Sequence, residues 1–355
     1  MTERVKNFCE ILKEDEAALV TSDINRIYLS GFKSSAGNVL VTKNSAYLLI
    51  DFRYFEKAKN EVQGLEVILC ERLYPQIAEF LKQNNIKTVF VENETTTLST
   101  FERITKNLPD FEVSDSKIVS SKLSEMRMIK TEQEVADIKA AQKITDEAFD
   151  YICTRIREGV SEKEIALDME FFMRKKGSEG VSFDFIVVSG KNSSLPHGVP
   201  TDKLIEKGDF ITMDFGAVVN GYRSDMTRTV ALGEVSDKQR EVYNTVLKAQ
   251  LESLKAINAG VKCCDVDKIA RDIIADKGYG KCFGHGLGHS VGLEIHESPA
   301  LSPRDESLLQ SGMIMTVEPG IYIENEFGVR IEDMVFVTEK GCVNLTNSPK
   351  EMIIL

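Results

Sequence analysis

The sequence predicts an α+β protein in which a smaller α/β domain precedes a larger domain of mixed helix and sheet. At 355 residues the chain exceeds what one ordinary core holds, which favours two domains. Strand-like and helix-like segments alternate over the first hundred or so residues, whereas strands dominate from Phe183 onward, apart from helices near 237–258 and 265–277. The stretch 116–130 between these regions is polar and charged, so we place the domain junction there.

The amino-terminal domain is expected at 1–124 and the carboxy-terminal domain at 125–355. Short apolar runs rich in valine, leucine and isoleucine predict strands in the first domain, and an apolar pattern of helical period predicts one helix. The strands are expected at 17–20, 38–41, 46–50 and 88–91, and the helix at 77–82.

Two helices are expected to open the second domain. Thr131 and Glu134 form a capping box, apolar residues recur after it at helical spacing, and Gly159 is expected to end the helix. A second capping box, Ser161 with Glu164, begins the next helix.

Composition and charge narrow the classes of function. A net charge of −12 and the lack of a basic stretch argue against a nucleic-acid surface, and we expect no nucleic-acid partner. No apolar run is long enough to span a bilayer, and the amino terminus lacks a secretory core. Seven cysteines without zinc-type spacing are expected to be reduced thiols, in keeping with the cytoplasm. The expected ligand is a small molecule or a peptide.

Histidines are rare in this chain and concentrated in one place. Three of the four, His285, His289 and His296, lie within the glycine-rich segment 283–297, and the fourth is His197. Because histidine binds transition metals and titrates near neutrality, this concentration points to a site of metal or proton chemistry.

Two aspartates are predicted to share one face of a hairpin. The Asn-Gly pair at 220–221 is the strongest short hairpin signal, because a type I′ turn needs positive φ at both central positions. The register that it sets places Asp214 opposite Thr227 and makes Asp225 its diagonal neighbour, about 7–8 Å away at the backbone. A slip of one residue would reverse Asp225, so two solvent-facing aspartates remain the alternative.

Two glutamates have a similar setting. Glu318 and Glu332 stand in apolar strands separated by the glycine-bearing segment 324–328. A buried carboxylate without a partner costs several kcal/mol, so each needs a cation or an exposed strand face.

Three segments look like familiar motifs, but none has the residues that the complete motif requires. Asp-Phe-Gly at 214–216 lacks every other kinase signature, and the glycines at 284–292 do not fit a dinucleotide fingerprint. His296-Glu297 lacks the second histidine of a zincin.

Taken together, these motifs resemble the creatinase/methionine aminopeptidase superfamily with its pita-bread fold, and within it the proline-specific peptidases prolidase and aminopeptidase P. The resemblance covers nearly the whole chain. The segment 25–32 suggests a creatinase-type amino-terminal domain, and the second domain carries five ligands in the family order Asp, Asp, His, Glu, Glu.

The resemblance assigns a role to each candidate residue. Asp214 would bind one metal, Asp225 and Glu332 would bridge both, and His289 and Glu318 would complete the other. Glu318 would also move the proton of the attacking water. The residues expected to bind substrate and stabilise charge are His197, His285, His296 and Arg330.

Two divalent ions are therefore expected. The oxygen-rich donor set favours manganese, with zinc, cobalt and iron as the other options. The resemblance implies an Xaa-Pro aminopeptidase that acts as a homodimer on short proline-containing peptides, with an Xaa-Pro dipeptidase (prolidase) as the alternative. Ala300 stands where many relatives have an arginine for the substrate carboxylate, which favours the aminopeptidase unless Arg304 substitutes.

Other readings within the fold are a metal-free creatinase-type enzyme and a non-catalytic peptide-binding module. The presence of all five ligands argues against both, and the additional amino-terminal domain argues against a methionine aminopeptidase.

Overall fold

The structure is a computed structural model that describes all 355 residues. It consists of two compact units, Met1–Met126 and Arg127–Leu355, and each has a hydrophobic core of its own. The polar stretch in which we place the junction forms helix α6 (Ile118–Met128), and the division between the units falls in the last turn of that helix.

The first unit is built on a six-stranded mixed sheet with the strand order β4-β3-β2-β1-β5-β6. Its central strand β1 pairs antiparallel with β2 and parallel with β5. All four predicted strands form, and the predicted helix at 77–82 lies within α4. The strands are β1 (Glu16–Val20), β2 (Asn38–Thr42), β3 (Ala46–Ile50), β4 (Glu66–Leu69), β5 (Thr88–Val91) and β6 (Glu112–Ser114). The other helices are α1 (Glu3–Cys9), α2 (Asp23–Ser30), α3 (Phe52–Glu61), α4 (Leu73–Gln83) and α5 (Leu98–Asn107).

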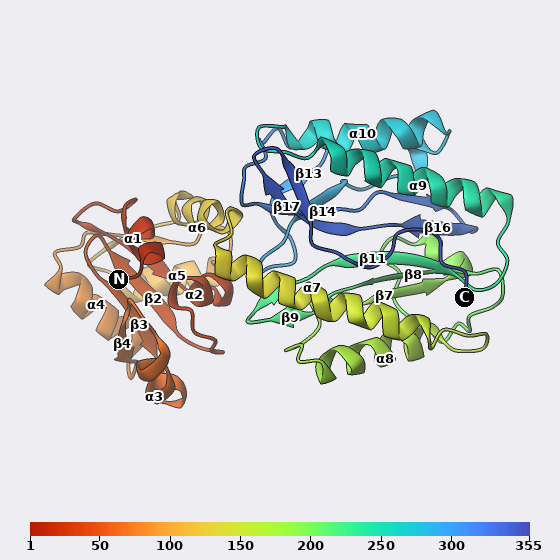
Figure 1. The fold of residues 1–355 in the computed structure, drawn as a ribbon. Helices are drawn as coiled ribbons and strands as arrows, with labels where there is room; N and C mark the ends of the chain where they lie inside the picture. The colour runs from red at the N-terminus through yellow and green to blue at the C-terminus, as the bar shows by residue number, and fades with distance from the viewer. The chain divides into compact units, whose positions relative to one another are not determined.

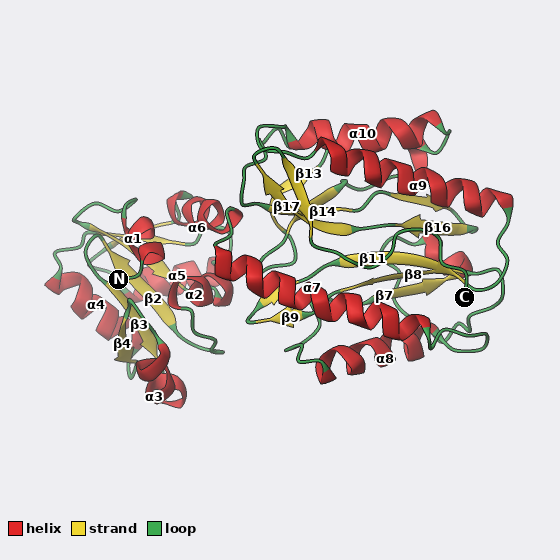
Figure 2. Ribbon diagram, viewed as in Figure 1, coloured by secondary structure: helices red, strands yellow, loops and turns green.

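In the second unit the strands lie between two pairs of helices, α7 with α8 on one side and α9 with α10 on the other (Figures 1 and 2). The helices are α7 (Glu132–Cys153), α8 (Glu162–Lys175), α9 (Asp237–Ala256) and α10 (Cys263–Asp276), with short 3-10 helices η1 (Gly190–Ser194) and η2 (Gly280–Cys282).

The strands of this unit form several sheets, the largest with the orders β11-β8-β7 and β13-β12-β14-β17-β18. Two short two-stranded sheets, β9 with β10 and β15 with β16, complete the set. The first strands are β7 (Ile186–Ser189), β8 (Phe210–Phe215), β9 (Val218–Val219), β10 (Tyr222–Arg223) and β11 (Met226–Ala231). The later strands are β12 (Gly288–Ser290), β13 (Glu297–Leu301), β14 (Ile314–Val317), β15 (Gly320–Ile323), β16 (Phe327–Arg330), β17 (Asp333–Thr338) and β18 (Gly341–Asn344).

Two cores hold these layers together. One packs α7 and α8 against β7, β8 and β11, and the other packs α9 and α10 against β14, β17 and the β15–β16 hairpin. Burying an apolar side chain of this kind contributes about 1.5–3 kcal/mol. The strands between the two cores are thereby held on both sides.

Both capping boxes that open the second unit form as predicted. The side chain of Thr131 accepts from the amide of Glu134, whose carboxylate accepts from the amide of Thr131, and Ser161 does the same with Glu164. The prediction that Gly159 ends the first helix is wrong, because α7 already ends at Cys153, with Thr154 as its C-cap. Beyond the helix the amide of Gly159 donates to the Ile205 carbonyl, and the amide of Ile205 donates to the Val160 carbonyl.

Two further observations concern the whole chain. No helix is both long and apolar enough to cross a membrane. All seven cysteines are free, in agreement with the reduced thiols expected from the sequence.

Candidate functional site

The aspartate hairpin has the predicted register. Asn220 and Gly221 have φ values of 51° and 86°, both in the left-handed region that a type I′ turn needs. Asp214 on β8 pairs with Thr227 on β11, which makes Asp225 its diagonal neighbour. Both aspartates are buried and face the same cavity, so the alternative of two solvent-facing aspartates is excluded.

The glutamates lie in a break between strands, which differs from the prediction. The register of β14 with β17 continues in that of β15 with β16, so Glu318 and Glu332 stand opposite each other in the gap. Pro319, which has no N–H to donate, follows the first of them. Outside the ladder, the amide of Glu332 donates to the Thr227 carbonyl (3.1 Å), and that of Glu318 to the Leu287 carbonyl (2.7 Å). Because the ladder is broken here, the backbone of Glu332 bonds to β11, and that of Glu318 bonds to the residue before β12.

His289 comes from β12 with its ring orientation fixed. Its Nδ1 lies 3.1 Å from the carbonyl of Ser290, which accepts only, so Nδ1 carries the proton and Nε2 faces inward. Nε2 lies 3.6 Å from Oδ2 of Asp225 and 3.4 Å from Oε1 of Glu318. The ring of His296 stands edge-on to that of His289, with the ring centroids 4.4 Å apart.

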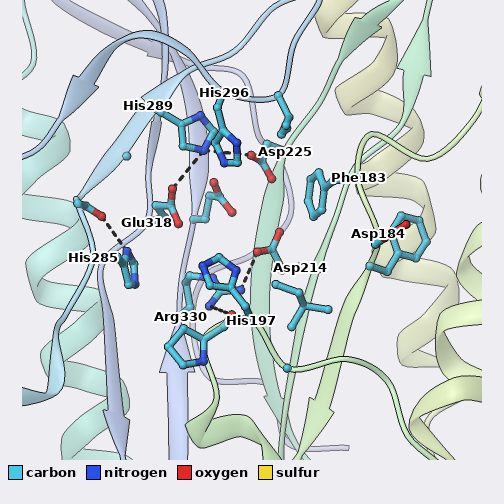
Figure 3. Close-up of a pocket in the computed structure, with 18 of the residues that line it drawn as sticks. Phe183, Asp184, His197, Asp214, Asp225, His285, His289, His296, Glu318 and Arg330 are labelled. Carbon is cyan, nitrogen blue, oxygen red and sulfur yellow. Dashed lines mark hydrogen bonds and ion pairs between the residues drawn. The ribbon is translucent and has the colours of Figure 1, made fainter. Parts of the chain in front are cut away.

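All nine predicted site residues line one cavity of about 690 Å³ (Figure 3). They are Asp214, Asp225, His289, Glu318 and Glu332, together with His197, His285, His296 and Arg330. Much of the remaining wall is apolar and is contributed by Phe183, Phe185, Pro196, Val199 and Ile295. Arg304 is exposed and lies outside this wall, whereas Ala300 is part of it.

The carboxylates of the cavity repel one another. Burial raises the pKa of Asp225 and of Glu332 well above the usual range, and the neighbouring carboxylates raise both further. Burial likewise raises the pKa of Glu318 to about 8, with Asp214 adding to it and Arg330 opposing it. Asp225, Glu318 and Glu332 therefore need positive charge close by to be ionised at neutral pH.

The same residues fit divalent cations. The ligand atoms of Asp225, His289 and Glu332 all lie within 4.8 Å of one another. Oδ1 of Asp214 and Oε1 of Glu332 are buried without a hydrogen-bond partner. Burial lowers the pKa of His289 to about 4, so its Nε2 presents a lone pair to the carboxylates. A cation bound between these groups would give the unpartnered oxygens and the inward lone pair of His289 the partner that they lack.

Arg330 and Tyr322 form a hydrogen-bonded chain at one end of the cavity. Arg330 donates through Nη2 to Oδ2 of Asp214 (2.6 Å) and through Nη1 to the Tyr322 hydroxyl (2.8 Å). That hydroxyl lies 2.9 Å from Nε2 of His285, whose Nδ1 lies 2.8 Å from the carbonyl of Gly286. Since a carbonyl only accepts, Nδ1 carries the proton and Tyr322 donates to Nε2.

This chain fixes the state of His285. Burial lowers the pKa of His285 to about 4, and the charge of Arg330 lowers it further, so the ring is neutral at pH 7. Both of its nitrogens already have partners. His197 and His296, by contrast, are exposed at the cavity.

Tyr322 is a site residue that the sequence analysis missed. Glycine in a strand often marks the close approach of another group, and Gly320, the first residue of β15, is such a signal. A Cβ atom at Gly320 would stand 2.4 Å from the Tyr322 hydroxyl. The register of β15 with β16 makes Tyr322 a diagonal neighbour of Arg330, by the rule that relates Asp214 to Asp225.

The comparisons with known proteins agree with this geometry. Residues 136–339 match the model of metallopeptidase family M24, and residues 4–129 match the creatinase/prolidase amino-terminal domain. The chain belongs to metallopeptidase family M24. This membership confirms the family and the fold predicted from the sequence, and it makes the protein a metal-dependent hydrolase.

Solved and curated relatives extend over nearly the whole chain. An Xaa-Pro dipeptidase from Bacillus anthracis superposes with a TM-score of 0.96 at 44% identity, covering 99% of each chain. An X-Pro aminopeptidase from Thermotoga maritima MSB8 superposes with a TM-score of 0.91 at 41% identity, covering 98% of this chain and 99% of its own. An Xaa-Pro dipeptidase of Pyrococcus horikoshii is 39% identical over 99% of each chain.

Proposed function

We propose that this metallopeptidase is an Xaa-Pro dipeptidase that hydrolyses the bond before proline. The observation that carries the proposal is the cavity in which four carboxylates and His289 meet beside an apolar wall. The relatives named Xaa-Pro dipeptidase support this reading better than the aminopeptidase reading that Ala300 suggests.

Five residues would hold two divalent cations: Asp214, Asp225, His289, Glu318 and Glu332. When bound, such a pair lowers the pKa of water and polarises the scissile carbonyl. The oxygen-rich donor set supports manganese, while zinc, cobalt and iron remain compatible with one imidazole among four carboxylates.

The remaining polar residues would handle protons and charge. Glu318 lines the cavity within 3.4 Å of His289 Nε2, where it can pass a proton from water to the leaving nitrogen. His296 is exposed to the cavity beside His289, where it can donate to the carbonyl oxygen as negative charge develops. His197 lines the exposed side and would bind substrate.

Arg330 and His285 would act less directly than the resemblance implies. Arg330 donates to Asp214, to Tyr322 and to the Pro196 carbonyl, and both nitrogens of His285 are engaged. Arg330 would therefore hold the Asp214 carboxylate in place. His285 would hold Tyr322 and contact the substrate through its ring edge.

The apolar wall would receive the prolyl ring. Phe183, Phe185, Ile295 and Pro196 offer a surface without hydrogen-bond demands. A tertiary amide to proline has no N–H, so peptidases that recognise an ordinary backbone lose a contact there. A cavity that recognises the prolyl ring by its shape and binds the scissile carbonyl through metal ions does not need that N–H.

An Xaa-Pro aminopeptidase is the second candidate. Ala300 lines the cavity where an arginine would meet the carboxylate of a dipeptide, and Arg304 does not replace it. The relative named X-Pro aminopeptidase shares 41% identity with this chain.

Substrate length decides between the two candidates. Purified protein is stripped of metal, reloaded with Mn²⁺ and offered Xaa-Pro dipeptides, Xaa-Pro-Yaa tripeptides and Xaa-Ala dipeptides. A dipeptidase prefers the first group, whereas a preference for the tripeptides favours the aminopeptidase. Equal rates on Xaa-Ala peptides refute proline specificity.

We also propose a homodimer. This rests on the family resemblance alone, and light scattering on the purified chain tests it. A monomer at the concentrations used for activity would contradict the proposal.

A further inference from the structure

The two histidines that flank the candidate metal centre belong to one hairpin loop. His289 lies on β12 and His296 directly precedes β13, and these strands pair with a bulge at His289 and Ser290. Beyond the bulge Ser290 pairs with Glu297. The spacing of the two rings therefore depends on how the Ser290–Glu297 pair is held.

A buried lysine from outside the hairpin bonds to both residues of the Ser290–Glu297 pair. Nζ of Lys130 donates to the hydroxyl of Ser290 (3.1 Å) and to Oε2 of Glu297 (3.1 Å). The side chains of Lys130 and Glu297 are only 2% and 4% exposed. One ammonium group thus binds both ends of the loop.

The other oxygen of Glu297 is held as well. Oε1 accepts from Nε and Nη2 of Arg127 (3.1 and 2.7 Å) and from the amide of Glu294 (3.2 Å). A Cβ at Gly292 would stand 2.5 Å from Glu297 Oε2, so the loop backbone crosses directly over the carboxylate. The carboxylate therefore organises the whole turn between the two histidines.

Charge supports an ionised pair. Burial alone would raise the pKa of Glu297, but Lys130 and Arg127 outweigh it and lower that pKa. At Lys130 burial prevails over Glu297 and lowers the pKa. The lowered pKa of Glu297 favours a charged carboxylate, whereas the lowered pKa of Lys130 disfavours a charged ammonium group. We assign the charged pair, because Glu297 faces two cations and a buried anion with several donors is well satisfied.

We propose that Glu297 and Lys130 are positioning residues that hold His296 beside His289 in the orientation the reaction needs. This inference rests on the proposed function for its catalytic part. Neither residue lines the cavity, so each acts through the loop and not on the substrate.

The test uses Glu297→Gln in the full-length chain, because glutamine keeps the shape of the side chain and removes its charge. Ser290→Ala, which deletes only the Lys130–Ser290 hydrogen bond, is the milder second variant should the first fold poorly. The matched control is Glu92→Gln in the first unit. Glu92 is a fully buried carboxylate that accepts hydrogen bonds from Thr21, Ser22 and Asn25.

Two readouts are needed. Histidine ring signals in ¹⁵N NMR of the metal-free chain are easily resolved, since there are only four histidines. Glu297→Gln should shift the signals of His289 and His296 and leave those of His197 and His285 in place. In the Mn²⁺-loaded enzyme it should lower kcat by about 10–100-fold, the usual scale for partners that orient metal-site residues, with KM changed little.

The control separates positioning from stability. Glu92→Gln should lower the unfolding temperature while kcat and the histidine signals stay as in the wild type. If Glu297→Gln leaves the His296 signal unmoved, or moves it without lowering kcat, the proposal is wrong. If the wild type cleaves no Xaa-Pro peptide, the proposed function fails, and the NMR comparison still decides whether Glu297 places His296.

Discussion

Replacing Thr227 by valine should weaken metal binding without changing the shape of the site. Thr227 is fully buried on β11, and its hydroxyl donates to Oε2 of Glu332 (2.8 Å) and accepts from Nε of Arg330 (3.0 Å). Since Oε1 of Glu332 is without a partner, this hydroxyl is the carboxylate's one hydrogen-bond donor. Valine has nearly the same volume and removes both hydrogen bonds.

The size of the effect follows from these contacts. A hydrogen bond to a charged group contributes about 1.5–3 kcal/mol, so unfolding by urea should show a loss of that order or somewhat more. The Thr227 hydroxyl also lowers the pKa of Glu332, against burial, which raises it. Without the hydroxyl, Glu332 is less readily ionised, and Mn²⁺ affinity should fall by about 10–100-fold.

Thr227→Ser is the control, because it keeps the hydroxyl and loses one methyl group, at a cost of about 1 kcal/mol. Mn²⁺ affinity is measured by competition with a fluorescent chelator on the metal-stripped chain. Wild-type affinity in Thr227→Val, or an equal loss in Thr227→Ser, would refute the reasoning.

Three further predictions follow from the same structure. His296→Ala should keep near-normal metal content and lower turnover by about two to four orders of magnitude; collapse of the metal content would show that His296 is a ligand. Tyr322→Phe should lower stability by about 1–3 kcal/mol, because Arg330 and His285 lose a buried partner, and should lower kcat; unchanged urea unfolding would refute this. Because the folded-state pKa of Glu297 is depressed, its contribution to stability is complete above the ordinary carboxyl value of about 4.3 and lost as pH falls through the lowered value. Urea unfolding between pH 7 and 3 should therefore show a steeper acid loss in the wild type than in Glu297→Gln, and parallel profiles would contradict it.

The aspartate half of the site was predictable from local sequence. The Asn-Gly turn fixes a register, and a register fixes which side chains share a face, so the placement of Asp214 and Asp225 followed from residues close in the chain. The capping boxes at Thr131 and Ser161 were predictable for the same reason.

The remaining features depend on contacts between distant segments. Strand periodicity placed Glu318 and Glu332 inside strands, whereas the backbone leaves the ladder there to bond with Leu287 and Thr227. The end of α7 was missed because Gly159, the expected stop, lies beyond the helix and donates its amide to the carbonyl of the distant Ile205. Lys130 and Glu297 are 167 residues apart, and no spacing rule connects them.

The central proposal is that the four carboxylates and His289 hold divalent cations that hydrolysis requires. The direct measurement titrates Mn²⁺ into the metal-stripped chain while metal content and Xaa-Pro hydrolysis are followed together, with Asp225→Asn and Glu332→Gln alongside. We expect no hydrolysis without metal, a rise in activity that ends at two Mn²⁺ per chain, and loss of both metal and rate in the two variants. Full activity in the stripped chain, or full metal content in both variants, would contradict it.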